Sequence, residues 1–91
     1  MDNNIHVSIL IPVRNERNYI EQCLESVFNQ QDISKIFEVI IADGMSTDGT
    51  REVIKNYQEK FPFLIMIDNP GKIVPTGMNI AIKKARGNFL I

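Results

Sequence analysis

Polar side chains with the chemistry of a ligand site follow an apolar segment in the middle of the chain. The stretch IIADGMSTDGT, residues 40–50, passes from branched apolar residues to an acid, a glycine and then hydroxyl groups. The carboxylate of Asp43, at the end of such a strand, can accept hydrogen bonds from a nucleobase N–H or a ribose hydroxyl. Gly44 would let the backbone approach a flat ligand, and the following helix would aim its free N–H groups at the same place.

A second polar loop, Pro12-Val13-Arg14-Asn15-Glu16, follows the first apolar segment. If both segments are parallel strands of one sheet, their carboxyl ends lie at the same edge, where the two loops meet. The residues expected in this crevice are Arg14, Asn15, Glu16, Asp43, Ser46 and Asp48.

Several of these residues also have a purely structural explanation. Ser46 or Asp48 could cap the helix that follows them, and Asn15 could cap the helix after the first loop. The glycines of the second loop could be turn residues only. No cap or turn requires an acid directly after a buried strand, so the placement of Asp43 favours a functional role.

Apolar segments and helical patterns alternate along the whole chain. The predicted strands span residues 7–11, 37–42, 63–67 and 88–91, and the predicted helices span residues 16–30, 49–60 and 76–86. In the last helix, the apolar stripe consists of Met78, Ala81, Ile82 and Ala85. The alternation predicts an α/β fold: a mostly parallel sheet of about four strands with three helices. Right-handed crossovers and the common doubly wound pattern give the strand order 3-2-1-4, with a ligand crevice between strands 1 and 4.

Length and composition restrict the class of protein. The 91 residues suffice for one small domain, and a net charge of −1 provides no basic footprint for nucleic acid. Cys23 is the only cysteine, which excludes an internal disulfide and favours a reducing compartment, so we expect a cytoplasmic location. The longest apolar runs are too short to cross a bilayer.

Other nucleotide-related folds lack their signatures in this chain. A dinucleotide-binding fold needs a glycine-rich turn after its first strand, yet no glycine precedes Gly44. The phosphate-binding loop GxxxxGK[ST] is absent. A receiver domain would need a pair of acids at the end of the first strand, and the first polar loop does not supply it.

Three segments of the chain resemble one known family. VSILIPVRNERNYIEQCLESVFNQ and FEVIIADGMSTDGTREVI resemble the start of a family 2 glycosyltransferase with the GT-A fold, and GMNIAIKKARGNFLI resembles the segment that follows. The motifs P-x-R-N-E and D-G-x-S-x-D-G-T at this spacing are specific as a pair, and the resemblance covers nearly the whole chain. It implies a Rossmann-like, nucleotide-sugar-binding half-domain, with a UDP-sugar as the expected donor.

The resemblance implies roles for individual residues. Pro12 and Glu16 match the first nucleotide-contacting loop of the family, with Glu16 near the base or the ribose. Asp43 matches the acid that bonds the base, and Asp48 matches a second acid that orients the loop. The expected nucleotide-binding residues are therefore Pro12, Arg14, Asn15, Glu16, Asp43, Ser46, Asp48 and Asn79.

Three further positions, which are Asn79, Lys72 and Met45, are compared with the family pattern. Asn79 falls where the family tends to have an asparagine near the nucleotide. Lys72 is a looser match that could approach the diphosphate. Met45 replaces the usual small residue between Gly44 and Ser46, so the shape of this loop departs from the family pattern.

The family holds its metal with an Asp-x-Asp motif after the fourth strand, whereas this chain ends at Ile91, inside that strand. We therefore expect residues 1–91 to be the N-terminal part of a GT-A domain, with no catalytic residue, no metal ligand and no sugar transfer of its own. In the complete enzyme, the hydroxyl of a sugar or glycoconjugate acceptor would attack the anomeric carbon in polysaccharide or glycoconjugate synthesis. Mn²⁺ or Mg²⁺ would neutralise the departing diphosphate. Association of the complete enzyme with a membrane stays open.

Two alternatives remain beside this interpretation. One is a non-catalytic interaction domain of the same fold, and the other, ranked last, is a nucleotidyltransferase, whose usual glycine-rich loop is absent here. An Asp-x-Asp after Ile91 would favour the transferase. A short strand at the edge of the sheet and a face covered by one helix would also favour self-association of the chain.

Overall fold

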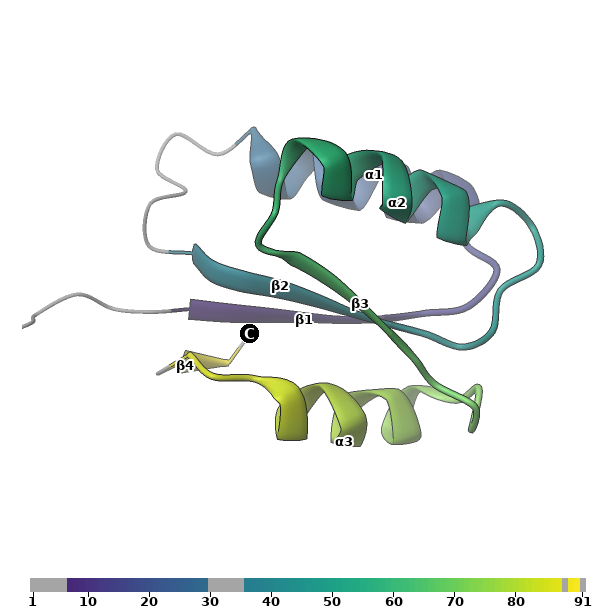
Figure 1. The fold of residues 1–91 in the computed structure, drawn as a ribbon. Helices are drawn as coiled ribbons and strands as arrows, with labels where there is room; N and C mark the ends of the chain where they lie inside the picture. The colour runs from purple at the N-terminus through teal and green to yellow at the C-terminus, as the bar shows by residue number, and fades with distance from the viewer. Residues whose placement is uncertain (1–6, 30–35, 88, 91) are drawn as a thin grey trace, which may run out of the picture.

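The computed structural model describes residues 7–29, 36–87 and 89–90. Strands and helices alternate along the chain, as the sequence predicts (Figure 1). The elements are β1 (Val7–Val13), α1 (Arg17–Phe28), β2 (Ile36–Asp43), α2 (Thr50–Lys60), β3 (Leu64–Asp68), α3 (Val74–Lys84) and β4 (Phe89–Leu90). Residues 30, 88 and 91 of the predicted elements lie outside the described residues.

The sheet has the strand order β3-β2-β1-β4, and all its pairings are parallel, which confirms the predicted topology. β4 is short and pairs with β1 at Val7 and Ser8. The helices α1 and α2 lie on one face of the sheet and α3 lies on the other (Figure 1). The carboxyl ends of β1, β2 and β3 therefore lie at the same edge of the molecule, next to the loops that lead into the three helices.

The larger part of the core lies between the sheet and the pair α1 and α2. α1 contributes Ile20, Leu24 and Val27, which lie on one face of the helix, and all three are buried. They pack with Val53 and Ile54 of α2 against alternate residues of β1 and β2. This agrees with the two-residue period that places successive strand side chains on opposite faces.

The face of the sheet under α3 has a smaller core, in which Leu10 and Ile40 pack against Ala81. The predicted stripe of α3 is wrong at Ile82, which is 46% exposed. Gly77 is buried instead, because a Cβ at this position would lie 2.9 Å from Nδ2 of Asn69 and 3.4 Å from Cβ of Ala42. Small residues thus let α3 approach the carboxyl end of the sheet closely.

Two boundaries differ from the prediction for identifiable reasons. β1 runs on through Pro12 to Val13. The carbonyl oxygen of Val13 accepts a hydrogen bond from the Gly44 N–H at 2.8 Å, so the backbone groups of Val13 point toward β2. The backbone nitrogen of Pro12 therefore points away from β2, and its missing N–H removes no hydrogen bond between β1 and β2. α3 begins at Val74, since Pro75 has the fixed φ that suits the first turn of a helix.

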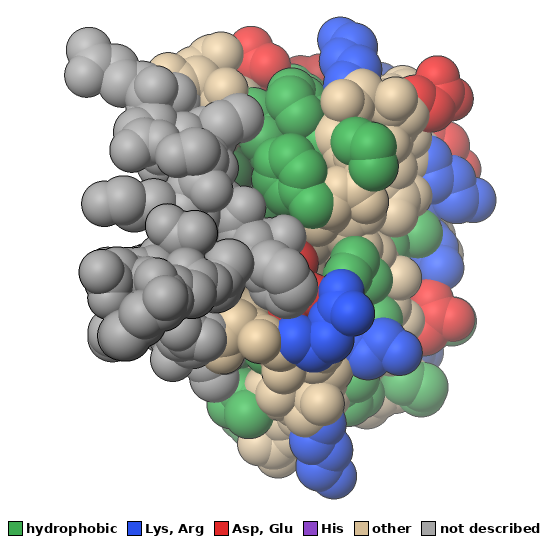
Figure 2. Space-filling model, turned by 60° about the vertical axis from the view of Figure 1, so that its left-hand side comes forward, with side chains coloured by type: hydrophobic (Ala, Val, Ile, Leu, Met, Phe, Trp, Pro, Cys, Tyr) green, Lys and Arg blue, Asp and Glu red, His purple; other side chains and the backbone are tan. Residues whose placement is uncertain are grey.

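Aromatic side chains close the core at the end of the molecule away from the carboxyl ends of the strands. Phe28 stacks on Phe61 with a centroid distance of 3.8 Å, and Tyr57 and Phe63 complete the cluster. Figure 2 shows hydrophobic side chains gathered on this end of the molecule. Within the described part of the chain, none of the helices combines the length and apolar character that crossing a membrane requires.

Candidate nucleotide-binding site

A pocket of about 360 Å³ opens at the carboxyl end of the sheet, between the β1–α1 loop and the β3–α3 loop. It is lined by Pro12, Val13, Arg14, Glu16, Tyr19, Asn69, Lys72, Ile73 and Val74. Of the residues predicted from the sequence, the structure places Pro12, Arg14, Glu16 and Lys72 on its wall. The other predicted residues, which are Asn15, Asp43, Ser46, Asp48 and Asn79, do not line it.

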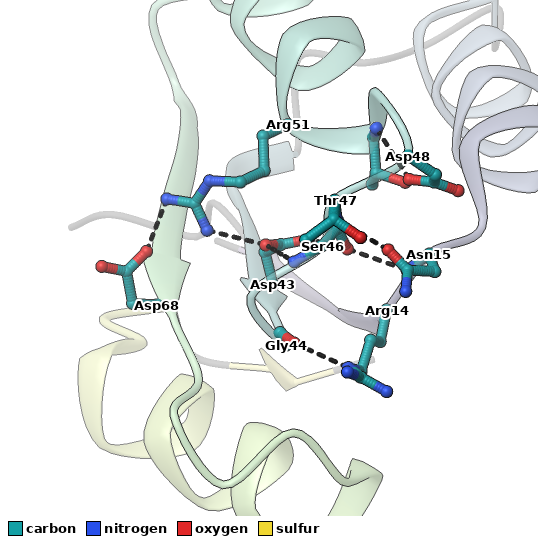
Figure 3. Close-up of polar contacts among 10 residues, drawn as sticks. Arg14, Asn15, Asp43, Gly44, Ser46, Thr47, Asp48, Arg51 and Asp68 are labelled. Carbon is teal, nitrogen blue, oxygen red and sulfur yellow. Dashed lines mark hydrogen bonds and ion pairs between the residues drawn. The ribbon is translucent and has the colours of Figure 1, made fainter.

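Asp43 ends β2 with its side chain fully buried and its carboxylate hydrogen-bonded within the protein (Figure 3). Oδ1 accepts from the Ser46 hydroxyl at 2.6 Å, and Oδ2 accepts from the Ser46 N–H at 2.9 Å. Oδ2 also accepts from Nη1 of Arg51 at 2.7 Å. Asp43 therefore organises the β2–α2 loop, and its oxygens face protein donors instead of the pocket.

Asn15 joins the β1–α1 and β2–α2 loops. Its backbone N–H donates to Oγ of Ser46 at 2.8 Å, and its side-chain Oδ1 accepts from the N–H of Thr47 at 2.7 Å (Figure 3). Asn15 has a φ of +50°, a left-handed conformation that asparagine adopts more readily than most residues. The alternative interpretation of Asn15 as the cap of α1 is wrong, because the N-cap is Glu16, whose side chain makes no cap bond.

Asp48 holds the first turns of two helices. Its Oδ1 accepts from the N–H and the hydroxyl of Thr50 at 3.0 Å and 2.5 Å, and its Oδ2 accepts from the N–H of Arg17 at 3.3 Å. The Thr50 hydroxyl, helped by these backbone N–H groups, holds the pKa of Asp48 below its ordinary value. A carboxylate at helix N-termini is also favoured by the helix dipole, so the structure supports the capping interpretation of Asp48.

Arg14 connects the pocket wall to the β2–α2 loop. Its Nε donates to the carbonyl oxygen of Gly44 at 3.0 Å (Figure 3). A Cβ on Gly44 would lie 3.1 Å from Cβ of Arg14, so glycine allows this side chain to pack across the loop. The next residue, Met45, has a φ of +61°, which is a left-handed backbone conformation that residues other than glycine rarely adopt.

Arg51 and Asp68 form a feature that the sequence analysis missed. Arg51, in the first turn of α2, places Nη1 on Asp43 and Nη2 on Oδ1 of Asp68 at 2.6 Å (Figure 3). Asp68, and then Asp43, raise the pKa of the Arg51 guanidinium. The signal was present in the sequence, because Asp68 ends β3 as Asp43 ends β2 and a cation follows in the next helix.

Asn69 fixes the other wall of the pocket. Its side chain is buried, donates from Nδ2 to the Ile73 carbonyl at 3.0 Å and accepts from the Thr76 hydroxyl at 2.9 Å. The Lys72 N–H donates to the Asn69 carbonyl at 3.0 Å, and Lys72 has a φ of +66°. The asparagine at the pocket is therefore Asn69, whereas the predicted Asn79 is exposed on α3.

The described residues contain no group of three or more His, Cys, Asp or Glu side chains placed to hold a metal ion. Glu16 is the acid that lines the pocket, whereas Asp43 and Asp68 share Arg51 and Asp48 binds helix N–H groups. The described part of the chain therefore does not fit a metal centre.

A parallel sheet of this order, with a pocket at the carboxyl ends of its strands, defines a doubly wound α/β domain with its pocket at the edge where ligands bind in such folds. The model of the family described as "Glycosyl transferase family 2" matches residues 8–91. The chain thus belongs to the family 2 glycosyltransferases.

Two characterised relatives illustrate the family. A dolichyl N-acetyl-alpha-D-glucosaminyl phosphate 3-beta-D-2,3-diacetamido-2,3-dideoxy-beta-D-glucuronosyltransferase of Methanococcus voltae is 41% identical in an alignment of 87 positions that covers 93% of this chain and 27% of that protein. A poly(ribitol-phosphate) beta-glucosyltransferase of Bacillus spizizenii is 32% identical in an alignment of 87 positions that covers 93% of this chain and 14% of that protein. The chain therefore spans about a quarter or less of the length of these relatives.

Solved structures agree with the GT-A fold. The mannosyltransferase PcManGT of Pyrobaculum calidifontis, in complex with GDP-Man and Mn²⁺, superposes with a TM-score of 0.84 at 26% identity, over 96% of this chain and 26% of that one. Mannosyl-3-phosphoglycerate synthase of Rubrobacter xylanophilus superposes with a TM-score of 0.76 at 17% identity, over 94% of this chain and 29% of that one. The second likeness shows the fold alone.

Proposed function

We propose that this chain is the donor-binding part of a family 2 glycosyltransferase and holds the nucleoside diphosphate of a sugar donor in the pocket between the β1–α1 and β3–α3 loops. The observation that carries the proposal is the lining of that pocket in a chain of this family. Apolar surface and a few polar groups meet there in a space of about 360 Å³. This is the usual composition of a small-molecule site.

The apolar part of the wall suits the face of a base. Tyr19, Ile73 and Val74 line the pocket and are all more than half exposed, which is uncommon for a group of large apolar side chains without an occupant. Pro12 and Val13 close the same space from the end of β1. A flat heterocycle in this space would cover these side chains and remove their apolar surface from water.

The charged part of the wall suits the ribose and the diphosphate. Lys72 and Arg14 approach the pocket from opposite loops and supply cationic donors for phosphate oxygens. Arg14 uses Nε for the Gly44 carbonyl, so its guanidinium is already anchored before a ligand binds. The Glu16 carboxylate can accept from ribose hydroxyls.

The role of Asp43 changes in this proposal. Direct contact with a base would require the Ser46 hydroxyl and N–H to leave a fully buried carboxylate. We therefore assign the ligand contacts to Arg14, Glu16 and Lys72, and assign to Asp43 the support of the loop against which Arg14 packs.

The donor base, the metal and the acceptor extend the proposal to the complete enzyme. A uridine diphosphate sugar is the first donor to test and a guanosine diphosphate sugar the second, because PcManGT was solved with GDP-Man. The same complex contains Mn²⁺, which supports a divalent cation beside the donor in the complete enzyme. The names of the relatives support a glycan or polyol-phosphate acceptor with a free hydroxyl.

Affinity measurements on matched variants test the pocket assignment. UDP and GDP are titrated into the 91-residue chain by NMR, with dissociation constants expected on the order of a millimolar, about −4 kcal/mol. Lys72→Gln and Glu16→Gln should each weaken binding roughly threefold to tenfold, because each removes one charged contact. Asn79→Ala, on the exposed side of α3, is the control and should bind like the wild type. Equal affinity of all four proteins would exclude Lys72 and Glu16 as ligand contacts, and no binding of any nucleotide would favour the interaction-domain alternative.

A further inference from the structure

We propose that Arg51 is a positioning residue for the nucleotide pocket, because it holds together the strand ends from which the β2–α2 and β3–α3 loops leave. Its effect on nucleotide binding rests on the function proposed above. Arg51 does not line the pocket. Its guanidinium lies between two carboxylates, with Nη1 at 2.7 Å from Asp43 Oδ2 and Nη2 at 2.6 Å from Asp68 Oδ1 (Figure 3).

The two carboxylates need such a bridge. Asp43 and Asp68 are the last residues of β2 and β3 and are direct register partners in the sheet. Like charges at paired positions repel each other and would spread the strand ends apart. A guanidinium can bind one carboxylate with each of two nitrogens, whereas a lysine ammonium is a single point of charge. The single positive charge of the arginine therefore offsets the repulsion between the two acids and fixes their separation.

Asn69 connects this bridge to the pocket wall. It follows Asp68 directly, and its N–H donates to the Asp43 carbonyl at 2.8 Å. Its buried side chain and its own carbonyl then hold Ile73 and Lys72 through hydrogen bonds of 3.0 Å each. A displacement of the end of β3 would therefore move Asn69, and with it Lys72 and Ile73 on this side of the pocket.

The two ends of the bridge are not equally dependent on Arg51. Asp43 is fully buried and keeps two hydrogen bonds from Ser46 when Arg51 is removed. The Asp68 side chain is 58% exposed, and Arg51 is its ion-pair partner within the described residues. Loss of Arg51 should therefore release the end of β3 and the β3–α3 loop, and leave the β2–α2 loop in place.

Three variants and a control test this assignment. Arg51→Gln removes the cation, Arg51→Lys keeps the charge but not the two-pronged geometry, and Asp68→Asn removes one carboxylate at an exposed position. Lys55→Gln is the matched control, since it removes a cation from an exposed position of the same helix. Backbone amide chemical shifts are measured first without ligand, and UDP affinity is measured second.

Without ligand, Arg51→Gln and Asp68→Asn should shift the amide resonances of Asn69, Lys72 and Ile73, while those of Ser46 and Thr47 stay near their wild-type positions. UDP binding should weaken roughly threefold to tenfold in both variants, with a smaller loss in Arg51→Lys and none in Lys55→Gln. Unmoved loop resonances in Asp68→Asn, or Arg51→Lys with wild-type shifts and affinity, would overturn the proposal. If Arg51→Gln fails to fold, the amide shifts and UDP affinities of Asp68→Asn and Arg51→Lys decide the role of Arg51. If the wild type binds no nucleotide, the proposed function fails, whereas the ligand-free shifts still decide the role of Arg51.

Discussion

Replacement of Asp43 by asparagine should destabilise the fold itself, in the absence of any nucleotide. The side chain is fully buried, and its oxygens accept from the Ser46 hydroxyl, the Ser46 N–H and Arg51. Asparagine has the same shape but one acceptor oxygen. If that oxygen keeps the Ser46 hydroxyl, its NH₂ group faces the Ser46 N–H and the Arg51 guanidinium, which are both donors.

The size of the effect follows from the bonds that are lost. A hydrogen bond to a charged acceptor contributes about 1.5–3 kcal/mol, and two are lost. Removal of a buried charge offsets part of this loss, so the lower end of the range applies and gives about 3 kcal/mol. A small domain has a free energy of unfolding of about 5–15 kcal/mol, so the melting temperature should fall by roughly 12–24 °C.

Urea unfolding followed by circular dichroism measures this loss directly. The midpoint should move while the slope against urea concentration stays constant, since the surface exposed on unfolding is unchanged. Asp68→Asn is the matched control, because it makes the same chemical change on the other, exposed carboxylate of Arg51 and should cost less than about 1 kcal/mol. An Asp43→Asn variant within about 1 kcal/mol of the wild type would refute the view that this carboxylate is a buried anchor of the loop.

Further expected outcomes concern packing, ionisation and association. Gly77→Ala should lower the free energy of unfolding, measured by urea unfolding, by about 1–3 kcal/mol, because its Cβ would lie 2.9 Å from the buried Nδ2 of Asn69. Alanine is the better helix former, so a variant more stable than the wild type would contradict this prediction. The folded-state pKa of Asp48 is lowered, chiefly by the Thr50 hydroxyl, so its contribution to stability is present above the unfolded-state pKa and is lost as the pH falls through the folded-state pKa. Asp48→Asn should therefore lose more stability at neutral pH than in acid, and a pH-independent loss in unfolding experiments would argue against this contribution. The hydrogen bond to Glu25 is the main cause that raises the pKa of Tyr57 to about 12, so Glu25→Gln should lower this value in an ultraviolet titration, and an unchanged titration would exclude the bond. The edge of the sheet beside the short β4 should support self-association, which sedimentation over a range of concentrations tests; a monomer throughout would refute it.

The sequence was sufficient for the fold because its signals are local and repeated. The spacing of Ile20, Leu24 and Val27 identifies the buried face of α1, and the apolar run of residues 39–42 identifies β2 as a strand covered on both faces. The strand order then follows from the handedness of the crossovers together with the common doubly wound pattern, which places the fourth strand beside the first. The start of α3 was predicted at residue 76 and lies at Val74, because Pro75 fits the first turn of a helix, which the apolar periodicity does not reveal.

The site was predicted only in part, because a sequence shows where an acid lies but not which way its oxygens face. Asp43 was expected in an open crevice, and its carboxylate is instead bonded to Ser46 and Arg51. The pocket lies between the first and third loops, since α3 crosses the opposite face of the sheet and brings Ile73 near the end of β1. That juxtaposition depends on close packing at Gly77, which no local pattern indicates.

The location of bound nucleotide is the most direct test of the central claim. Intermolecular nuclear Overhauser effects are recorded between the base and ribose protons of UDP and the side chains of the protein. Contacts are expected from the base to Tyr19 and Ile73, on the two walls of the pocket. Contacts to the hollow on α1 and α2 that is lined by Glu21 and Tyr57, with none to Tyr19 or Ile73, would contradict it.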